Sequence, residues 1–181
     1  WAANLAYITG QLQREDQSVS GILSSGPGAA EEVRALFDQL QPTLPVVLAN
    51  LAAEAIRLTR QLAALRNEPE VHGLLALMLL HHARRTARIT PTGRLIPLAE
   101  QNRTLWDTVM IAEGIAILYG ALAADQLGEY QAQAAIAALH ADAPTAADTD
   151  WVQIVEWYDE LLVLTPSDVV RLNRAVAIGE A

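Results

Sequence analysis

The sequence predicts an all-α protein in which helices pack as antiparallel pairs. Hydrophobic residues make up 52% of the chain, with Ala and Leu in excess, while aromatic residues make up only 5%, and this mix favours helices over a β-sandwich. The segment 71–80 carries seven large apolar side chains in ten positions. It is far shorter than the about 20 apolar residues that span a bilayer, so we expect a helix buried on all sides in a protein core.

Charge and residue usage narrow the range of functions. The chain has 181 residues, a net charge of −9 and a pI of about 4.8. Phosphate backbones repel such an acidic chain, so we expect no direct binding to nucleic acid. The absence of Cys excludes disulfides, thiolate metal ligands and cysteine nucleophiles. The chain starts at Trp1 and has no apolar run long enough to span a membrane, so we expect part of a longer protein without a membrane span.

The first 50 residues predict two amphipathic helices with a break between them. Residues 2–15 carry a narrow apolar stripe, and residues 31–40 begin with two acids that suit the positive end of a helix dipole. The segment SSGPG at 24–28 separates the two helices. Pro42 and Pro45 end the second helix, because a residue that precedes proline is pushed out of helical geometry.

This region resembles the helical segment after the core domain of actinobacterial MCE (mammalian cell entry) proteins, which are exported lipid-import proteins. The resemblance covers about residues 1–51 and rests on WAANLA at 1–6, QL at 11–12, GP at 26–27, LFD at 36–38 and, most specifically, LQPTLPVVLANL at 40–51. The sheet-rich MCE domain has no counterpart here, so the resemblance implies no lipid site. Two amphipathic helices with Pro and Gly between them are the alternative interpretation.

A long helix is expected from Pro45, which suits a first helical turn, to about residue 65. Its apolar residues recur at alternating spacings of three and four, as in an a/d seam: Leu48, Leu51, Ala55, Leu58, Leu62 and Leu65. We expect this leucine seam to pack on the 71–80 helix as an antiparallel pair, because the connection is short. A coiled coil with a partner protein is the alternative. Asn67 and Glu70 are expected to cap the second helix as a capping box.

Basic residues follow the apolar 71–80 segment. His81 and His82 are adjacent, and adjacent positions on a helix diverge by about 100°, so we expect no shared metal ion. The cluster of Arg84, Arg85 and Arg88 could contact a phosphate, Arg84 and Arg85 are also candidates for contact with a partner, and a solvated helix C-terminus is the alternative. Residues 89–96 predict two short extended pieces around a turn, as in a small hairpin.

The next helix, expected at about 104–124, is mostly apolar but contains one carboxylate. Thr104 and Asp107 are expected to start it as a variant of the capping box. Glu113 lies among apolar residues, where burial can raise the pKa of a carboxyl group and suit it to general acid or base chemistry. Pairing with an Arg, or exposure at a helix edge, is the alternative.

Three shorter helices are expected to complete the chain, at about 130–140, 150–164 and 168–178. The second is amphipathic, and Ser167 is expected to cap the third. Trp151, Ile154 and Tyr158 fit the first-helix pattern of a tetratricopeptide (TPR) repeat. Together with the succession of helix pairs, this pattern predicts a TPR-like right-handed array.

The part of the chain from about residue 52 to residue 181 resembles the TPR-like C-terminal extension of a group of bacterial extracytoplasmic-function (ECF) sigma factors. The motifs are EAIRL at 54–58, EVHGLLALMLL at 70–80, LWD at 105–107 with IAEG at 111–114, YQxQAAIAAxHA at 130–141 (x, any residue), DTDW at 148–151 and LNRAVA at 172–177. In that family, promoter-binding sigma domains precede the extension. Here the MCE-like segment takes their place, so the sequence resembles a chimera of two families with domains 1–51 and 52–181, the second truncated at its C-terminus.

The resemblance to sigma factors implies a regulatory, protein-interaction module in transcription initiation, without DNA-binding domains of its own. Its partners would be RNA polymerase or sigma domains, and its location cytoplasmic. The MCE resemblance implies the alternative, which is the helical part of an exported lipid-transport protein of the cell envelope. We expect no enzyme activity, because no Gly-rich phosphate loop, HExxH motif or convincing pair of acids is present.

No catalytic, cofactor-binding or metal-binding residue is therefore predicted, and no cofactor. The candidates for contact with a partner or ligand are basic, acidic and aromatic residues on the predicted helices: Arg84, Arg85, Trp106, Glu113, Tyr130, Trp151 and Tyr158.

Overall fold

The computed structural model describes residues 44–90 and 94–181, and the two helices expected within residues 1–43 lie outside this part of the chain. Within it are six α-helices: α3 (Leu44–Leu65), α4 (Pro69–Ala83), α5 (Thr108–Leu122), α6 (Glu129–Asp142), α7 (Trp151–Leu164) and α8 (Asp168–Glu180). Three 3-10 helices lie between α4 and α5: η1 (Arg85–Ala87), η2 (Leu98–Glu100) and η3 (Arg103–Leu105). The described residues contain no β-strand, so the predicted all-α class is confirmed.

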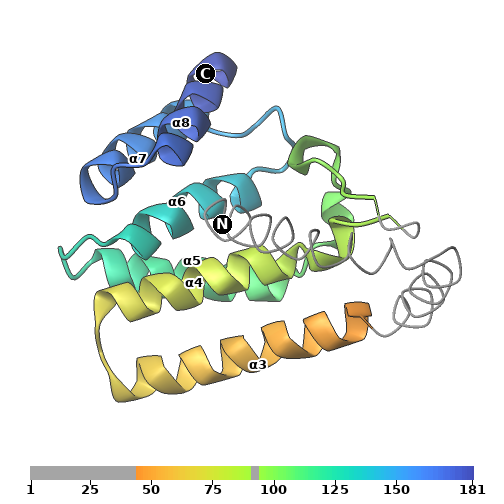
Figure 1. Cartoon of the computed structure of the whole chain (residues 1–181), viewed down its shortest axis with the longest axis vertical. Coiled ribbons are helices and arrows are strands. Elements are labelled where there is room, and N and C mark those ends of the chain that lie inside the picture. Colours follow the sequence, from red (N-terminus) through yellow and green to blue (C-terminus); the bar gives the residue numbers. More distant parts are fainter. Residues whose placement is uncertain (1–43, 91–93) are drawn as a thin grey trace, which may run out of the picture. The chain divides into compact units, whose positions relative to one another are not determined.

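Successive helices run in opposite directions and pack as antiparallel pairs (Figure 1). Helix α4 packs on both α5 and α6, α6 packs on α7, and α7 packs on α8. The predicted helix pairs are therefore confirmed, while the TPR-like right-handed repeat stays a prediction.

The chain divides into two compact units, Trp1–Ala53 and Glu54–Ala181. The second unit contains the C-terminal half of α3 and every later helix. The assignment of residues 1–51 and 52–181 to two different families stays a prediction.

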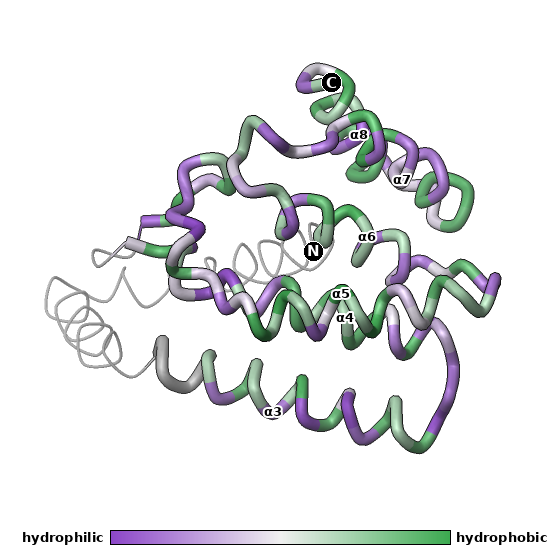
Figure 2. Tube along the Cα trace, turned by 180° about the vertical axis from the view of Figure 1, so that it is seen from behind, coloured by the Kyte–Doolittle hydropathy of each residue, from purple (hydrophilic) through white to green (hydrophobic). Residues whose placement is uncertain are grey.

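Helix α4 lies at the centre of the second unit. Leu75, Ala76, Leu79 and Leu80 are at most 4% exposed. Ala76 and Leu80 belong to a cluster shared with α5 and α6, whereas Leu75 and Leu79 pack with residues of α3. Neighbouring helices thus cover α4 on more than one side, which explains why it has no polar face; α4 and α5 are mostly green in Figure 2. Each fully buried leucine contributes roughly 1.5–3 kcal/mol to folding.

The face of α3 that packs on α4 is not the predicted leucine seam. Ile56 and Ala63 are 7% and 8% exposed, and the Thr59 hydroxyl donates a hydrogen bond to Met78 Sδ at 3.4 Å. The seam lies outside: Leu51, Leu58, Leu62 and Leu65 are 61%, 51%, 45% and 84% exposed. The prediction was wrong because α3 carries apolar residues on two faces. The face with the smaller side chains, Ala63 and Thr59, lies against α4.

Local capping signals mark the starts of α5, α7 and α8. Each N-cap side chain accepts a hydrogen bond from a backbone N–H three residues later: Asp107 from Met110 at 3.0 Å, Asp150 from Gln153 at 2.9 Å and Ser167 from Val170 at 3.2 Å. The cap predicted at Ser167 is confirmed. Thr104 does not begin the helix as predicted, because it lies in η3, and α5 begins after Asp107.

The predicted capping box at Asn67 and Glu70 is wrong. Glu68 occupies the N-cap position of α4, and its side chain makes no capping hydrogen bond. Glu70 instead accepts a hydrogen bond from the backbone N–H of Tyr130 at 2.7 Å. It therefore caps α6, whose own N-cap residue, Gly128, has no side chain with which to do so.

Gly73 allows α4 and α6 to approach closely near the place where Glu70 caps α6. A Cβ atom added to Gly73 would lie 2.6 Å from Gln131 Cγ and 2.8 Å from the Gln131 backbone nitrogen. Gln131 is fully buried, and its amide nitrogen donates to the Gln126 carbonyl at 2.7 Å. The absence of a side chain at Gly73 therefore makes room for a buried polar residue.

The predicted hairpin-like connection at 89–96 is confirmed at its two ends. Ile89 and Leu95 form an isolated antiparallel bridge. The backbone N–H of Thr90 donates to the Arg94 carbonyl at 2.9 Å, and that of Ile96 donates to the Arg88 carbonyl at 2.8 Å. This connection leads from α4 towards η2 and η3.

Candidate functional site

The C-terminal end of α4, η3 and the C-terminal end of α6 bring several basic side chains together. Arg84 is the C-cap residue of α4 and is only 5% exposed. One of its terminal nitrogens lies 3.1 Å from His81 Nδ1, and a terminal nitrogen of Arg88 lies 3.4 Å from the same atom. Arg103, in η3, donates from one terminal nitrogen to the carbonyls of His140 at 2.7 Å and Ala143 at 2.8 Å. We call Arg84, Arg88, Arg103, His81, His140 and Trp106 the basic cluster.

Trp106 is the centre of the basic cluster. Its side chain follows η3 and is 6% exposed. The guanidinium carbon of Arg103 lies 4.4 Å from the centroid of the indole, and that of Arg84 lies 5.7 Å away. Both cations are thus within the range of a cation–π interaction with one ring. Two of the sequence candidates, Arg84 and Trp106, therefore lie together.

Burial keeps the two histidines of the basic cluster neutral. Desolvation, with the nearby charges of Arg84 and Arg88, lowers the pKa of His81 to about 3. Desolvation, with the charges of Arg84 and Arg103, lowers the pKa of His140 to about 4. Burial, followed by the charges of Arg88 and Arg103, lowers the pKa of Arg84 to about 10, so Arg84 is still a cation at neutral pH. The cluster therefore carries its charge on arginine alone.

Two buried donors of the basic cluster have no hydrogen-bond acceptor among the described residues. They are Nε of Arg84 and Nε1 of Trp106. In the same part of the chain, no ion pair involves Arg84 or Arg103. Burial lowers the pKa of Arg103, and the negative charge of Asp148 opposes this fall.

The other sequence candidates lie apart from Arg84 and Trp106, with one partial exception. Trp151 at the start of α7 packs edge-on against the ring of His140, with centroids 5.1 Å apart, and so borders the basic cluster. Arg85 is exposed at the start of η1, and Tyr130 is 39% exposed at the start of α6. Tyr158 is half-buried in the cluster between α6, α7 and α8, and burial raises its pKa.

Glu113 pairs with an arginine. Both of its carboxylate oxygens accept from Arg60 of α3, one of them at 2.9 Å. The Arg60 pKa is raised by this pairing. The alternative interpretation of Glu113 is therefore confirmed, and its carboxylate lies at the contact between α3 and α5.

Sequence reasoning missed Arg103 and His140 as members of a site. Arg103 follows an apparent loop, and His140 ends an Ala-rich helix 37 positions later. The one local signal is the spacing of Arg103 and Trp106, three residues apart, which a short helical turn would bring to the same side.

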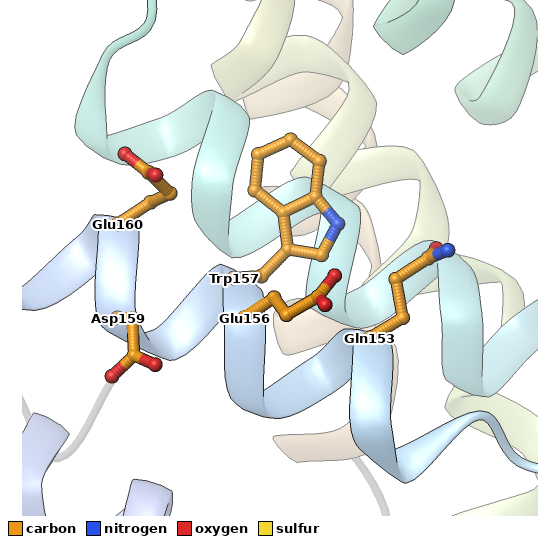
Figure 3. Close-up of a pocket in the computed structure, with 5 residues that line it drawn as sticks. All are labelled: Gln153, Glu156, Trp157, Asp159 and Glu160. Atoms are coloured by element: carbon orange, nitrogen blue, oxygen red, sulfur yellow. The ribbon is translucent and has the colours of Figure 1, made fainter.

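A second candidate surface is an open hollow on α7. It has a volume of about 610 Å³ and is lined by Gln153, Glu156, Trp157, Asp159 and Glu160. In Figure 3 the Trp157 ring extends from α7 on the same side as the Glu156 and Gln153 side chains, while Asp159 points the other way. Asp159 is paired with Arg174 of α8. The hollow thus combines an aromatic wall with carboxylates at the surface.

Exposed apolar side chains are also present on α7 and α8. On α7, Val152 and Val163 are 61% and 80% exposed. On α8, three further apolar residues share a face: Val169, Leu172 and Val176 are 38%, 65% and 56% exposed. We call the residues that line the hollow, together with these exposed apolar residues of α7 and α8, the α7–α8 surface.

Metal and membrane sites find no support in the part of the chain that the structure describes. No group of three or more His, Asp or Glu in residues 44–90 and 94–181 is arranged to hold a metal ion. None of the helices in these ranges is long and apolar enough to cross a bilayer.

Two comparisons with known proteins found a match, one to the region of α3 to α5 and one to a longer stretch of the chain. Residues 41–122, which reach from just before α3 to the end of α5, match the family of unknown function DUF6596. A stretch of 135 residues, 74% of the chain, is 48% identical to an uncharacterized protein of Rhizobium meliloti (strain 1021). This stretch covers 32% of that protein, so the chain spans about a third of the length of the relative that it matches. No solved structure matches the chain.

Proposed function

We propose that this chain is a protein-interaction module that regulates transcription initiation as the C-terminal extension of an ECF-type sigma factor. The observation that carries the proposal is the α7–α8 surface, which combines exposed apolar side chains on two neighbouring helices with carboxylates around Trp157. A surface that combines exposed apolar and polar residues is typical of a site that binds another protein. In this proposal the chain acts by binding and performs no catalytic step.

Charge complementarity indicates what the partner segment is like. The chain carries a net charge of −9, and Glu156 and Glu160 lie in the hollow without an ion pair among the described residues. A domain that binds promoter DNA needs a basic surface, because most of its affinity comes from phosphate contacts. An acidic, partly apolar surface therefore suits a basic amphipathic segment of a sigma domain. The relevant resemblance is that of residues 52–181 to the sigma-factor extension.

Binding of this kind would regulate the sigma domains by competition. A basic segment held on the α7–α8 surface is withdrawn from the DNA phosphates that it would otherwise neutralise. Because both contacts depend on charge, each weakens as salt is added. The chain would thereby lower promoter binding until a second signal releases the segment.

The longer relative from Rhizobium meliloti offers a direct test. The part of that protein outside the matched stretch is purified, and its binding to core RNA polymerase and to this 181-residue chain is measured by titration calorimetry. We expect it to bind both, and we expect the chain to reduce run-off transcription by the polymerase. If that part of the relative does not bind core polymerase, the sigma-factor context is wrong.

A charge-matched pair of variants tests the surface itself. The double variant Glu156→Gln, Glu160→Gln removes two carboxylates from the hollow on α7. The control Glu100→Gln, Asp142→Asn removes two exposed carboxylates elsewhere, so both proteins have the same net charge. We expect the first to bind the basic partner about tenfold more weakly than the control, since each charge pair at an interface rim adds up to about 1 kcal/mol. Equal affinities would show that net charge, and not the hollow, attracts the partner.

A further inference from the structure

The basic cluster shares no residue with the α7–α8 surface. Two of its buried N–H donors lack a hydrogen-bond acceptor among the described residues. Arg84 is only 5% exposed, yet none of the ion pairs among the described residues includes it. A buried cation without an opposite charge is unfavourable, and a second cation on the same indole, Arg103, adds repulsion. The cluster therefore favours any group that brings negative charge.

The hydrogen-bonding groups point to the same kind of ligand. The unpartnered buried atoms of Arg84 and Trp106 are both N–H donors, Nε and Nε1. Arginine and tryptophan side chains have no acceptor to offer each other, so only an incoming acceptor can satisfy them. Carboxylate and phosphate oxygens are the acceptors that arginine binds most strongly.

Among the residues that the structure describes, the groups near Arg84 do not supply the missing charge. His81 accepts a hydrogen bond from Arg84 but is neutral. The C-terminal end of α4 offers only the partial negative charge of a helix dipole. Arg103 uses one terminal nitrogen on two backbone carbonyls, which are also uncharged.

We propose that Arg84, Arg103 and Trp106 bind a small oxyanion, either a free phosphate or the carboxylate or phosphate group of a small molecule. Arg84 Nε and Trp106 Nε1 would donate to its oxygens, and the two guanidiniums would offset its charge. Arg103 and His140 are half-buried, so the cluster reaches solvent on their side. This inference does not rest on the proposed function, because it involves neither α8 nor the hollow on α7.

Nuclear magnetic resonance of the full chain, labelled with ¹⁵N at its tryptophan indoles, tests the site directly. Trp106→Phe identifies the Trp106 signal by its loss. We expect this signal to shift in a saturable way when sodium phosphate or sodium acetate is added at constant ionic strength, with the other indole signals changing less. Phosphate alone would identify a phosphate group as the ligand, and acetate alone a carboxylate. A signal that moves with neither anion, or equally with sodium chloride, overturns the proposal.

Variants separate binding from folding. Arg84→Lys keeps one positive charge but lacks the Nε–H donor, and the neighbouring exposed Arg85→Gln is the control. We expect the dissociation constant of the effective anion to rise about tenfold or more in Arg84→Lys and to stay unchanged in Arg85→Gln, because a hydrogen bond to a charged group is worth about that factor. Trp106→Phe, which keeps an aromatic ring but loses the N–H donor and part of the indole, should weaken binding as well. Equal affinity in all three variants and in the unaltered chain overturns the proposal even if Arg84→Lys is less stable.

Discussion

The helices α4, α5 and α6 differ from the α7–α8 pair in how much of each helix is covered. Helix α4 packs on α5 and α6 and also contacts α3, and Leu79 and Leu80 have no exposed surface. In α8, by contrast, Ala177 is the buried residue, while Leu172 and Val176 face outward. A helix that is covered on several sides needs apolar residues all round, whereas a helix at the edge needs a single stripe. The covered helices α4, α5 and α6 therefore contribute most to stability, whereas the α7–α8 pair leaves apolar side chains exposed for contact with another molecule.

The largest effect that distinguishes the two regions is expected from Leu79→Ala. Leu79 of α4 is completely buried and packs with residues of α3. Its truncation leaves a cavity and should lower the free energy of unfolding by about 2–5 kcal/mol. Leu172→Ala, the matched change on α8, should alter it by less than about 0.5 kcal/mol. Urea unfolding followed by circular dichroism measures both. Equal losses would show that α8 is covered as fully as α4.

Acid should destabilise the α4–α6 region through His81 and His140, which lie on α4 and α6. Their pKa values of about 3 and about 4 are below the 6.5 of an unfolded histidine. The unfolded chain therefore binds protons first as pH falls, and stability is lost from about pH 6.5 down to about pH 4 through His140 and down to about pH 3 through His81. The loss is at most about 1.4 kcal/mol per pH unit for each histidine, and less where solvent reaches the ring.

Unfolding free energies measured across this pH range test the assignment. The double variant His81→Gln, His140→Gln should give a flatter dependence on pH than the unaltered chain. The α7–α8 pair contains no histidine, so hydrogen exchange at low pH should rise first in α4 and α6. A profile that is unaffected by the two substitutions would contradict the prediction.

A smaller but position-specific effect is expected from Gly73→Ala. The added methyl group would lie 2.6 Å from Gln131 Cγ and 2.8 Å from the Gln131 nitrogen, which forces α4 and α6 apart. We expect a loss of about 1–3 kcal/mol. Gly120→Ala is the control, because nothing lies within 4 Å of the new methyl group on α5, and a helical Gly→Ala change should stabilise by about 0.5–1 kcal/mol. Thermal melting shows whether the two changes have opposite signs.

The smallest expected effect concerns the cap of α8. Ser167→Ala removes the acceptor of the Val170 N–H and should cost about 1 kcal/mol. Because α8 packs mainly on α7 among the described helices, we expect faster hydrogen exchange confined to α8. Exchange that rises equally in α4 would mean that the edge pair and the covered helices unfold as one unit.

The positions of the helices could be read from the sequence because their causes are local. Pro166 and Ser167 separate α7 from α8, and the apolar run at 71–80 forms the central part of α4. Caps, prolines and helical periodicity act within a few residues, so they are visible without knowledge of the fold. The all-α class and the antiparallel pairing follow from these local signals and short connections.

Only the tertiary structure decided which faces and side chains meet. Helix α3 has two apolar faces, and contact with α4 selected the one with Ile56 and Ala63. Glu70 caps α6, 60 positions away, instead of its own helix. The basic cluster likewise joins Arg84, Arg103 and His140 from three separate elements. Such contacts depend on packing between distant segments, and no periodicity or spacing within one helix encodes them.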